Sequence, residues 1–93
     1  MIELTKELLA EMETMASLMF TKKEIAFFLE LSASDFREIL DDGADEPYKL
    51  FMRGRLKQEA NVRKSIFDLA SNGSSPAQAF AFRLIENAKL DDL

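Results

Sequence analysis

The chain has 93 residues, of which 47% are apolar and 31% charged, a size and composition typical of one globular domain. It contains no cysteine and no histidine, which excludes disulfides, thiolate metal sites and the side chain that most often acts as a general base near neutral pH. Acidic residues interrupt the N-terminal apolar stretch, so we expect neither a signal peptide nor a membrane span. We expect a cytoplasmic, noncatalytic protein without metal or cofactor.

The net charge of −5 is distributed unevenly. Residues 1–50 carry 5 Lys and Arg against 12 Asp and Glu, a net charge of −7, whereas residues 51–93 carry 7 against 5, a net charge of +2. Affinity for duplex DNA comes largely from contacts between basic side chains and phosphates. If the first half binds DNA, its binding should be weak, sensitive to salt or dependent on several copies acting together.

Apolar spacing and helix-capping signals predict five helices. Five apolar residues are spaced by four, four, three and four positions, so they lie on one face of a first helix from Thr5 to about Met19: Leu4, Leu8, Met12, Met15 and Met19. Thr21 with Glu24 forms a capping box for a second helix, 21–29, and Ser32 with Asp35 repeats the device for a third, 32–43.

The two remaining helices fill the second half of the chain. Pro47 suits the first turn of a fourth helix, from 46 to about 71, in which Gly54 indicates a bend or a close helix crossing. Asn72 and Gly73 predict a left-handed stop. Ser75 as the N-cap, Pro76 in the first turn and Gln78 as the capping-box residue predict a fifth helix that reaches about residue 89. We therefore predict an all-α single domain, 1–93, with a three-helix part (1–43) and a helical hairpin of a long and a shorter helix (46–89).

The second and third helices have the apolar spacing of a helix-turn-helix, because six residues at fixed offsets can meet between them: Ile25, Ala26, Leu29, Leu31, Phe36 and Ile39. Glu30 stands where such a turn usually has glycine, and a left-handed backbone there would cost about 1–2 kcal/mol. The candidate DNA-binding residues lie at the starts of the two helices: Lys22, Lys23, Ser32, Ser34 and Arg37. Arg37 could instead pair with Asp41, and the lysines could be ordinary solvated residues.

The long fourth helix carries a second basic stripe of Arg53, Lys57 and Lys64, which can share one face. The fifth helix is apolar on more than one side, which indicates a partner surface. We predict an oligomer interface that uses four apolar residues: Phe27, Phe80, Phe82 and Ile85. Phe27 could instead pack on the first or fourth helix of its own chain.

The order of these features resembles the small terminase subunits of tailed bacteriophages and prophages over roughly residues 20–88. The resemblance rests on the capped helix-turn-helix with Glu24–Ala26 and Ser32, on Phe51–Arg55 opening a long helix, on Ile66–Ala70, and on the junction Asn72–Ala77. It implies recognition of viral DNA in packaging, ring-like homo-oligomers, delivery of DNA to a large ATPase-nuclease subunit and a site in the bacterial host cytoplasm. By this resemblance Lys22, Lys23, Ser34 and Arg37 would face DNA.

Two other readings stay open. One is a small transcriptional regulator, although such a protein more often exposes a net-positive reading face. The other is a protein-interaction module on a helix-turn-helix scaffold without DNA binding, which the net charge of −7 in residues 1–50 favours.

Overall fold

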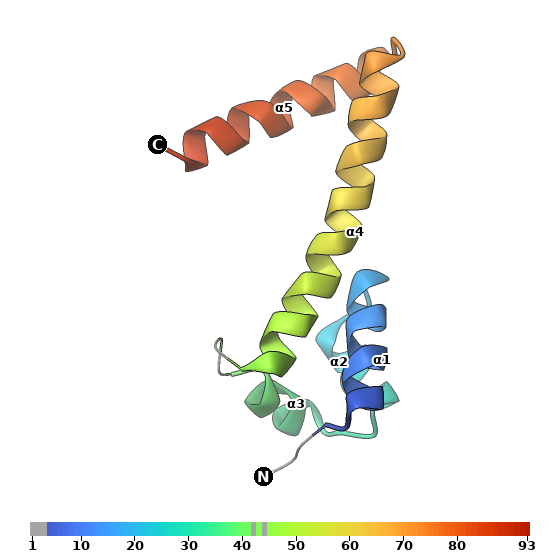
Figure 1. Ribbon diagram of the computed structural model, residues 1–93, viewed down its shortest axis with the longest axis vertical. Helices are drawn as coiled ribbons and strands as arrows, with labels where there is room; N and C mark the ends of the chain where they lie inside the picture. Colours follow the sequence, from blue (N-terminus) through green and yellow to red (C-terminus); the bar gives the residue numbers. More distant parts are fainter. Residues whose placement is uncertain (1–3, 42, 44) are drawn as a thin grey trace. The chain divides into compact units, whose positions relative to one another are not determined.

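The computed structural model describes residues 4–41, 43 and 45–93, and within these it contains five α-helices and no strand (Figure 1). The helices are α1 (Lys6–Ser17), α2 (Lys22–Phe28), α3 (Ala33–Ile39), α4 (Glu46–Ser71) and α5 (Ser75–Asp91). The all-α prediction is confirmed. The helix ends lie within a few residues of the predicted ones, except that α3 ends at Ile39 rather than near residue 43.

Side-chain caps start four of the helices. The predicted capping box of α2 is present: the N–H of Glu24 donates to Thr21 Oγ1 over 3.1 Å, and the N–H of Thr21 donates to Glu24 Oε1 over 2.9 Å. At α3 only half of the predicted box forms, because Ser32 Oγ accepts from the N–H of Asp35 but the shorter Asp35 side chain makes no return bond. Thr5 caps α1 in the same one-sided way.

The prediction for the start of α5 was wrong by one residue. Ser74, rather than Ser75, is the N-cap, and its side chain accepts from the N–H of Ala77. Gln78 does not close a capping box; its Nε2 donates instead to the carbonyl of Ala70 over 3.1 Å. The side chain thereby ties the first turn of α5 to the last turn of α4.

Three helices end in the same left-handed turn. After α4 the residue in this turn is Gly73, with φ 99°, as the sequence predicts. After α1 and α2 the corresponding residues are Met19 (φ 65°) and Glu30 (φ 60°), where an L side chain meets its own carbonyl. In each turn the next N–H bonds back to the last helical turn, as from Leu31 to the carbonyl of Ala26 over 2.8 Å. These bonds satisfy carbonyls that the helix end would otherwise leave without a donor.

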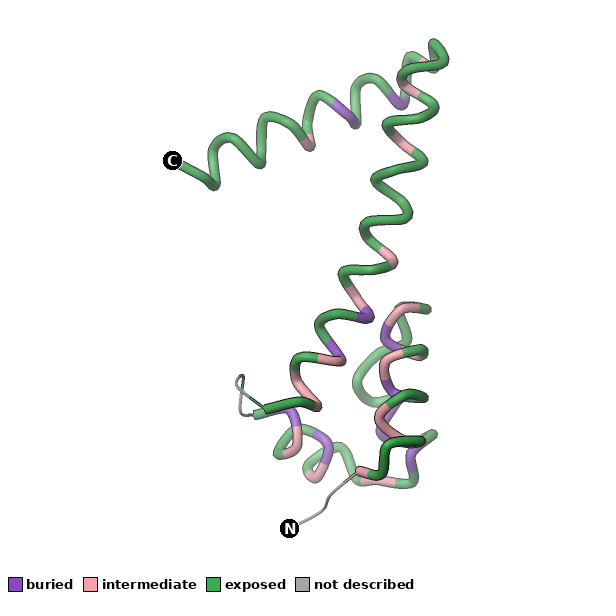
Figure 2. The backbone as a smooth tube through the Cα atoms, in the orientation of Figure 1, coloured by how far each residue is buried: buried purple, intermediate pink, exposed green. Residues whose placement is uncertain are grey.

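The chain divides into two compact units, residues 1–58 and 59–93, with the division inside α4 rather than at the loop before it. The first unit contains α1, α2, α3 and the first part of α4. Its core gathers where these helices face one another (Figure 2) and consists of eight buried apolar residues: Met12, Ala16, Ile25, Ala26, Leu29, Phe36, Leu40 and Phe51.

Two predicted core positions of the first unit are occupied differently. Ile39 is only half-buried, and Leu40, which directly follows the last residue of α3, takes its place in the core. Met19 is exposed, because it lies beyond the end of α1 in the left-handed turn and no longer follows the helical face. Ala16, the next-to-last residue of α1, is fully buried instead.

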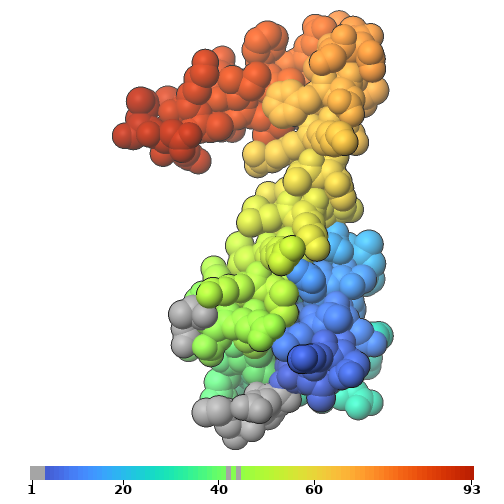
Figure 3. All heavy atoms as spheres, in the orientation of Figure 1, coloured from blue at the N-terminus to red at the C-terminus, as the bar shows by residue number. Residues whose placement is uncertain are grey.

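Gly54 marks a close crossing of α1 and α4 within the first unit. A Cβ atom at this position would overlap the carbonyl oxygen of Glu13 and approach the Ala16 Cβ to 2.9 Å and the Ser17 nitrogen to 3.2 Å. Figure 3 shows the blue α1 lying directly against the first turns of α4. Close packing, rather than a bend, therefore accounts for the glycine.

The second unit consists of the last part of α4, the turn at Gly73 and α5. Its buried side chains among the described residues are two alanines, Ala77 and Ala81, and most of its surface is exposed (Figure 2). Among the residues that the structure describes, none of the helices combines the length and the apolar character that a bilayer span requires.

Candidate functional site

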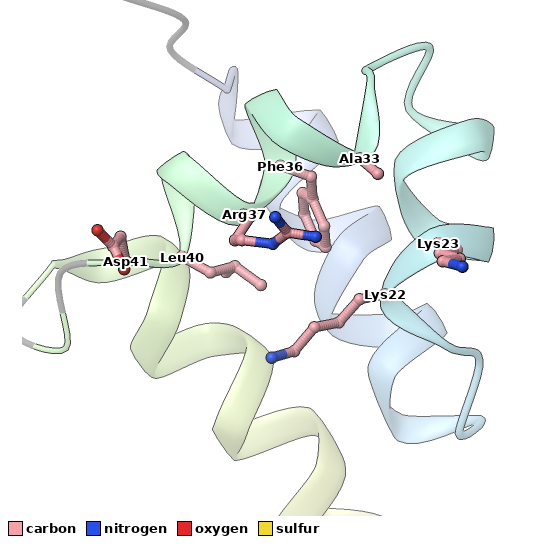
Figure 4. Close-up of a pocket in the computed structure, with 7 residues that line it drawn as sticks. All are labelled: Lys22, Lys23, Ala33, Phe36, Arg37, Leu40 and Asp41. Carbon is pink, nitrogen blue, oxygen red and sulfur yellow. The ribbon is translucent and has the colours of Figure 1, made fainter.

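The strongest candidate site is a cavity of about 390 Å³ between the start of α2 and the outer face of α3 (Figure 4). It is lined by three cations, three apolar residues and one carboxylate: Lys22, Lys23, Arg37, Ala33, Phe36, Leu40 and Asp41. The structure therefore brings three of the five candidate DNA-binding residues, which lie up to 15 positions apart in the sequence, to one opening.

Two local features fix the position of these cations. The capping box sets the first turn of α2 and with it the backbone of Lys22 and Lys23. The turn at Glu30 then reverses the chain so that α3 packs on α2, with Phe36 only 1% exposed beneath the cavity. Arg37 follows Phe36 directly and is therefore carried on the exposed side of α3.

The charged side chains around the cavity point in different directions. In Figure 4 the guanidinium of Arg37 is turned toward α2, Lys22 reaches toward α4, and Asp41 lies at the far end of the opening. Among the described residues Arg37 forms no ion pair with Asp41, although the two are four positions apart on the chain. Within the described residues no carboxylate pairs with the Arg37 guanidinium.

Sequence reasoning missed another cation, which lies near the same aromatic ring as Lys22. Arg55 from α4 places its Cζ 4.7 Å from the centre of the Phe51 ring, and Lys22 Nζ lies 5.7 Å from the same centre. Arg55 Nη2 also donates to the carbonyl of Phe20 over 2.9 Å, which anchors the guanidinium at the turn before α2. No sequence signal reports this contact, because 35 positions separate the two residues.

Both cations lie at one buried ring that attracts them through its negative face. Phe51 is held in the core by an edge-on contact with Phe36, with ring centres 6.5 Å apart. Within the described part of the chain neither Lys22 nor Arg55 pairs with a carboxylate. Each of the two cations adds to the positive potential near the Phe51 ring.

The remaining predicted basic and polar residues lie apart from the cavity lining. Ser32 is the cap of α3 and Ser34 is exposed on its first turn, and neither lines the cavity. Arg53 forms an ion pair with Glu13, with 3.8 Å between Nε and Oε2. Lys57 belongs to the first unit and Lys64 to the second, and both are exposed.

A second concave surface lies on the other side of α2, and we call it the phenylalanine groove. It is an open groove of about 900 Å³ lined by five apolar and two acidic residues: Met15, Phe20, Phe27, Phe28, Leu31, Glu24 and Glu30. Phe27 is 87% exposed and Phe28 more than half exposed, so neither belongs to the core. Helix α2 thus separates a basic cavity from an apolar groove whose charged lining residues, among those that the structure describes, are Glu24 and Glu30.

Comparison of the chain with protein-family models, curated proteins and solved structures finds no match.

Proposed function

We propose that this chain is a noncatalytic DNA-binding adaptor of the small-terminase type. In this proposal α2 and α3 form a helix-turn-helix, several copies act together on duplex DNA, and a large ATPase-nuclease subunit receives the DNA. The last part of α4 and α5 form the helical hairpin through which copies associate. The observation that carries the proposal is the meeting of Lys22, Lys23 and Arg37 at one cavity between the two helices.

The roles of these residues follow from how a helix-turn-helix docks. The first helix crosses the sugar-phosphate backbone, and the first turns of the second helix enter the major groove. Lys22 and Lys23 begin α2 and would contact phosphates, whereas Arg37 and Ser34 lie on the exposed side of α3 and would face the bases. Guanidinium groups bind guanine through two parallel hydrogen bonds, which makes Arg37 the candidate for sequence recognition.

Arg55 adds to this surface. Its guanidinium lies at the Phe51 ring with the Lys22 ammonium, so a phosphate that reaches Lys22 would also feel the charge of Arg55. Arg55 Nη2 donates to the Phe20 carbonyl and Nε is buried without a hydrogen-bond partner, so the remaining Nη hydrogens are the donors left for a phosphate. The acidic residues Glu24 and Glu30 line the phenylalanine groove and not the cavity, so they oppose binding less than the net charge suggests.

The test is a titration of a fluorescently labelled, mixed-sequence duplex with the full chain at low salt. Arg37→Glu should abolish binding, and Arg55→Gln should weaken it. Lys6→Glu is the matched control: it changes the charge by the same amount as Arg37→Glu at an exposed position on α1, and should bind nearly as well as wild type. Equal losses for Arg37→Glu and Lys6→Glu would mean that net charge, and not this cavity, governs binding.

A second candidate function is a protein-interaction module on the same scaffold. The phenylalanine groove favours it, because exposed phenylalanines beside carboxylates are typical of a protein-binding surface. A wild-type chain that binds no duplex at about 50 mM salt, where phosphate contacts are strong, would favour this function. High affinity for one duplex sequence by a single copy would instead favour the small transcriptional regulator.

A further inference from the structure

Asp41 lines the basic cavity although its charge opposes both phosphate binding and the stability of α3. Among the described residues that line the cavity it is the one carboxylate, beside the cations of Lys22, Lys23 and Arg37. A carboxylate at such a surface repels phosphates. Asp41 also follows the C-terminus of α3, where the helix dipole disfavours a negative charge. Within the described part of the chain it forms no ion pair that offsets either cost.

Asp41 lies on the side of α3 that the proposed function directs toward the bases. Ser34, Arg37 and Asp41 are spaced i, i+3 and i+7, so they follow one side of the helix, and all three are exposed. Helix α3 ends at Ile39, but the N–H of Asp41 still donates to the carbonyl of Glu38 over 3.2 Å, so the chain continues to turn. Asp41 therefore extends the side with Ser34 and Arg37 by about one turn.

Arg37 and Asp41 are placed to contact two different bases. Figure 4 shows their side chains directed away from each other. Four residues of an α-helix correspond to a rise of about 6 Å. Successive bases on one strand of B-DNA are about 3.4 Å apart along the helix axis. When α3 lies in the major groove, the two side chains therefore reach bases that are one or two steps apart.

A carboxylate can accept hydrogen bonds from two groups in the major groove, the N4 amine of cytosine and the N6 amine of adenine. The adenine amine lies between two acceptors, its own N7 and O4 of the paired thymine, and both repel a carboxylate. The cytosine amine has one acceptor beside it, O6 of the paired guanine, and a C–H group on its other side. A carboxylate therefore favours cytosine over adenine, and it finds no donor on guanine or thymine.

We propose that Asp41 determines sequence specificity by accepting a hydrogen bond from N4 of a cytosine, one or two steps from the guanine that Arg37 binds. This inference rests on the proposed function, because it requires α3 to enter the major groove. The carboxylate repels the phosphates of every duplex, whereas the hydrogen bond forms only where a cytosine is present. Asp41 thereby lowers the affinity for most sequences and restores it for one class, and the difference between the two is the specificity.

The test is a selection from duplexes with a randomised segment, which are bound by the full chain at low salt and sequenced before and after binding. We expect the pool bound by wild type to be enriched in a cytosine at a fixed distance from a guanine. Changing that cytosine to adenine in one selected duplex should weaken binding about fivefold or more, the effect of one mismatched base pair. 7-Deazaadenine should weaken binding less than adenine does, because it lacks the N7 acceptor.

Asp41→Asn and its matched control Glu38→Gln separate base recognition from charge. Each variant removes one exposed carboxylate, in the last turn of α3 or directly after it. Asparagine accepts from N7-bearing adenine poorly as a charge but binds its N6 and N7 edge through two hydrogen bonds, so the pool bound by Asp41→Asn should have adenine in place of the cytosine and keep the guanine. Glu38 does not line the cavity, so Glu38→Gln should raise the affinity for all duplexes by a similar factor and select the wild-type sequence.

The two proposals fail in different ways. If Asp41→Asn selects the same bases as wild type, or if wild type binds duplexes without enriching a cytosine, Asp41 only repels phosphates and this inference is overturned while the proposed function stands. If wild type binds no duplex at about 50 mM salt, both are overturned. Both variants should unfold at or above the wild-type Tm, because each removes negative charge near the C-terminus of α3, so poor folding does not imitate a change in base preference.

Discussion

Replacing Gly54 with alanine tests the close crossing of α1 and α4. Alanine gains up to about 1 kcal/mol over glycine inside a helix. The added methyl group, however, would overlap the Glu13 carbonyl oxygen and crowd the Ser17 nitrogen, both backbone atoms that cannot rotate away. Overpacking costs typically about 1–3 kcal/mol, and because the obstacle is backbone we expect the upper end, which leaves a net loss of about 2 kcal/mol.

The assay is thermal and urea unfolding followed by circular dichroism, with all chains at the same concentration so that association does not differ. A loss of about 2 kcal/mol corresponds to a decrease in Tm of roughly 8–16 °C for a chain of this size. Gly43→Ala is the control. Among the described residues a Cβ there would meet the Tyr48 ring at 3.7 Å, an ordinary contact, so this change should alter stability by less than about 0.5 kcal/mol. A Gly54→Ala chain as stable as wild type would refute the close crossing.

Three further predictions concern the turn, the core and the DNA-binding surface. Glu30→Gly should stabilise the chain by up to about 1 kcal/mol in urea unfolding, because φ is 60° at this position. Glu38→Gly, inside α3, should destabilise the chain by about as much. A loss of stability in both variants would contradict strain in the turn. Phe36→Ala should lower the free energy of unfolding by about 3–5 kcal/mol, whereas Phe27→Ala, at an exposed position, should lower it by less than about 0.5 kcal/mol. Equal losses in the two variants would contradict the placement of Phe36 in the core. If Lys22, Lys23 and Arg37 each contact one phosphate or base edge, the logarithm of the DNA-binding constant should fall with a slope of about −2.7 against the logarithm of salt, or about 40-fold from 50 to 200 mM. A slope near zero in that titration would exclude these contacts.

The helices and their caps could be predicted from local sequence, because each depends on residues a few positions apart. The capping box at Thr21 and the left-handed Gly73 are contacts between near neighbours, and both were predicted correctly. The two errors also concern residues only a few positions apart. Ser74 rather than Ser75 caps α5, since consecutive serines offer the same hydroxyl, and Met19 continues the apolar spacing of α1 although the helix has already ended.

The candidate site could be predicted only in part. Lys22, Lys23 and Arg37 follow from the offsets of the apolar residues, which indicate which sides of α2 and α3 remain outside. Arg55 could not be predicted, because its contact with Phe20 depends on how α4 packs on the other helices and not on any nearby spacing.

The sequence by itself determined an all-α chain, the positions of its helices and the exposure of some of its phenylalanines, because periodicity and capping are properties of short segments. Only the tertiary structure decided which side chains converge. It placed the cations of α2 and α3 around one cavity and put Glu24 and Glu30 in the phenylalanine groove on the other side of α2. The physical reason is that net charge is a sum over the chain, whereas an approaching phosphate responds to the charges nearest to it, and packing alone sets those distances.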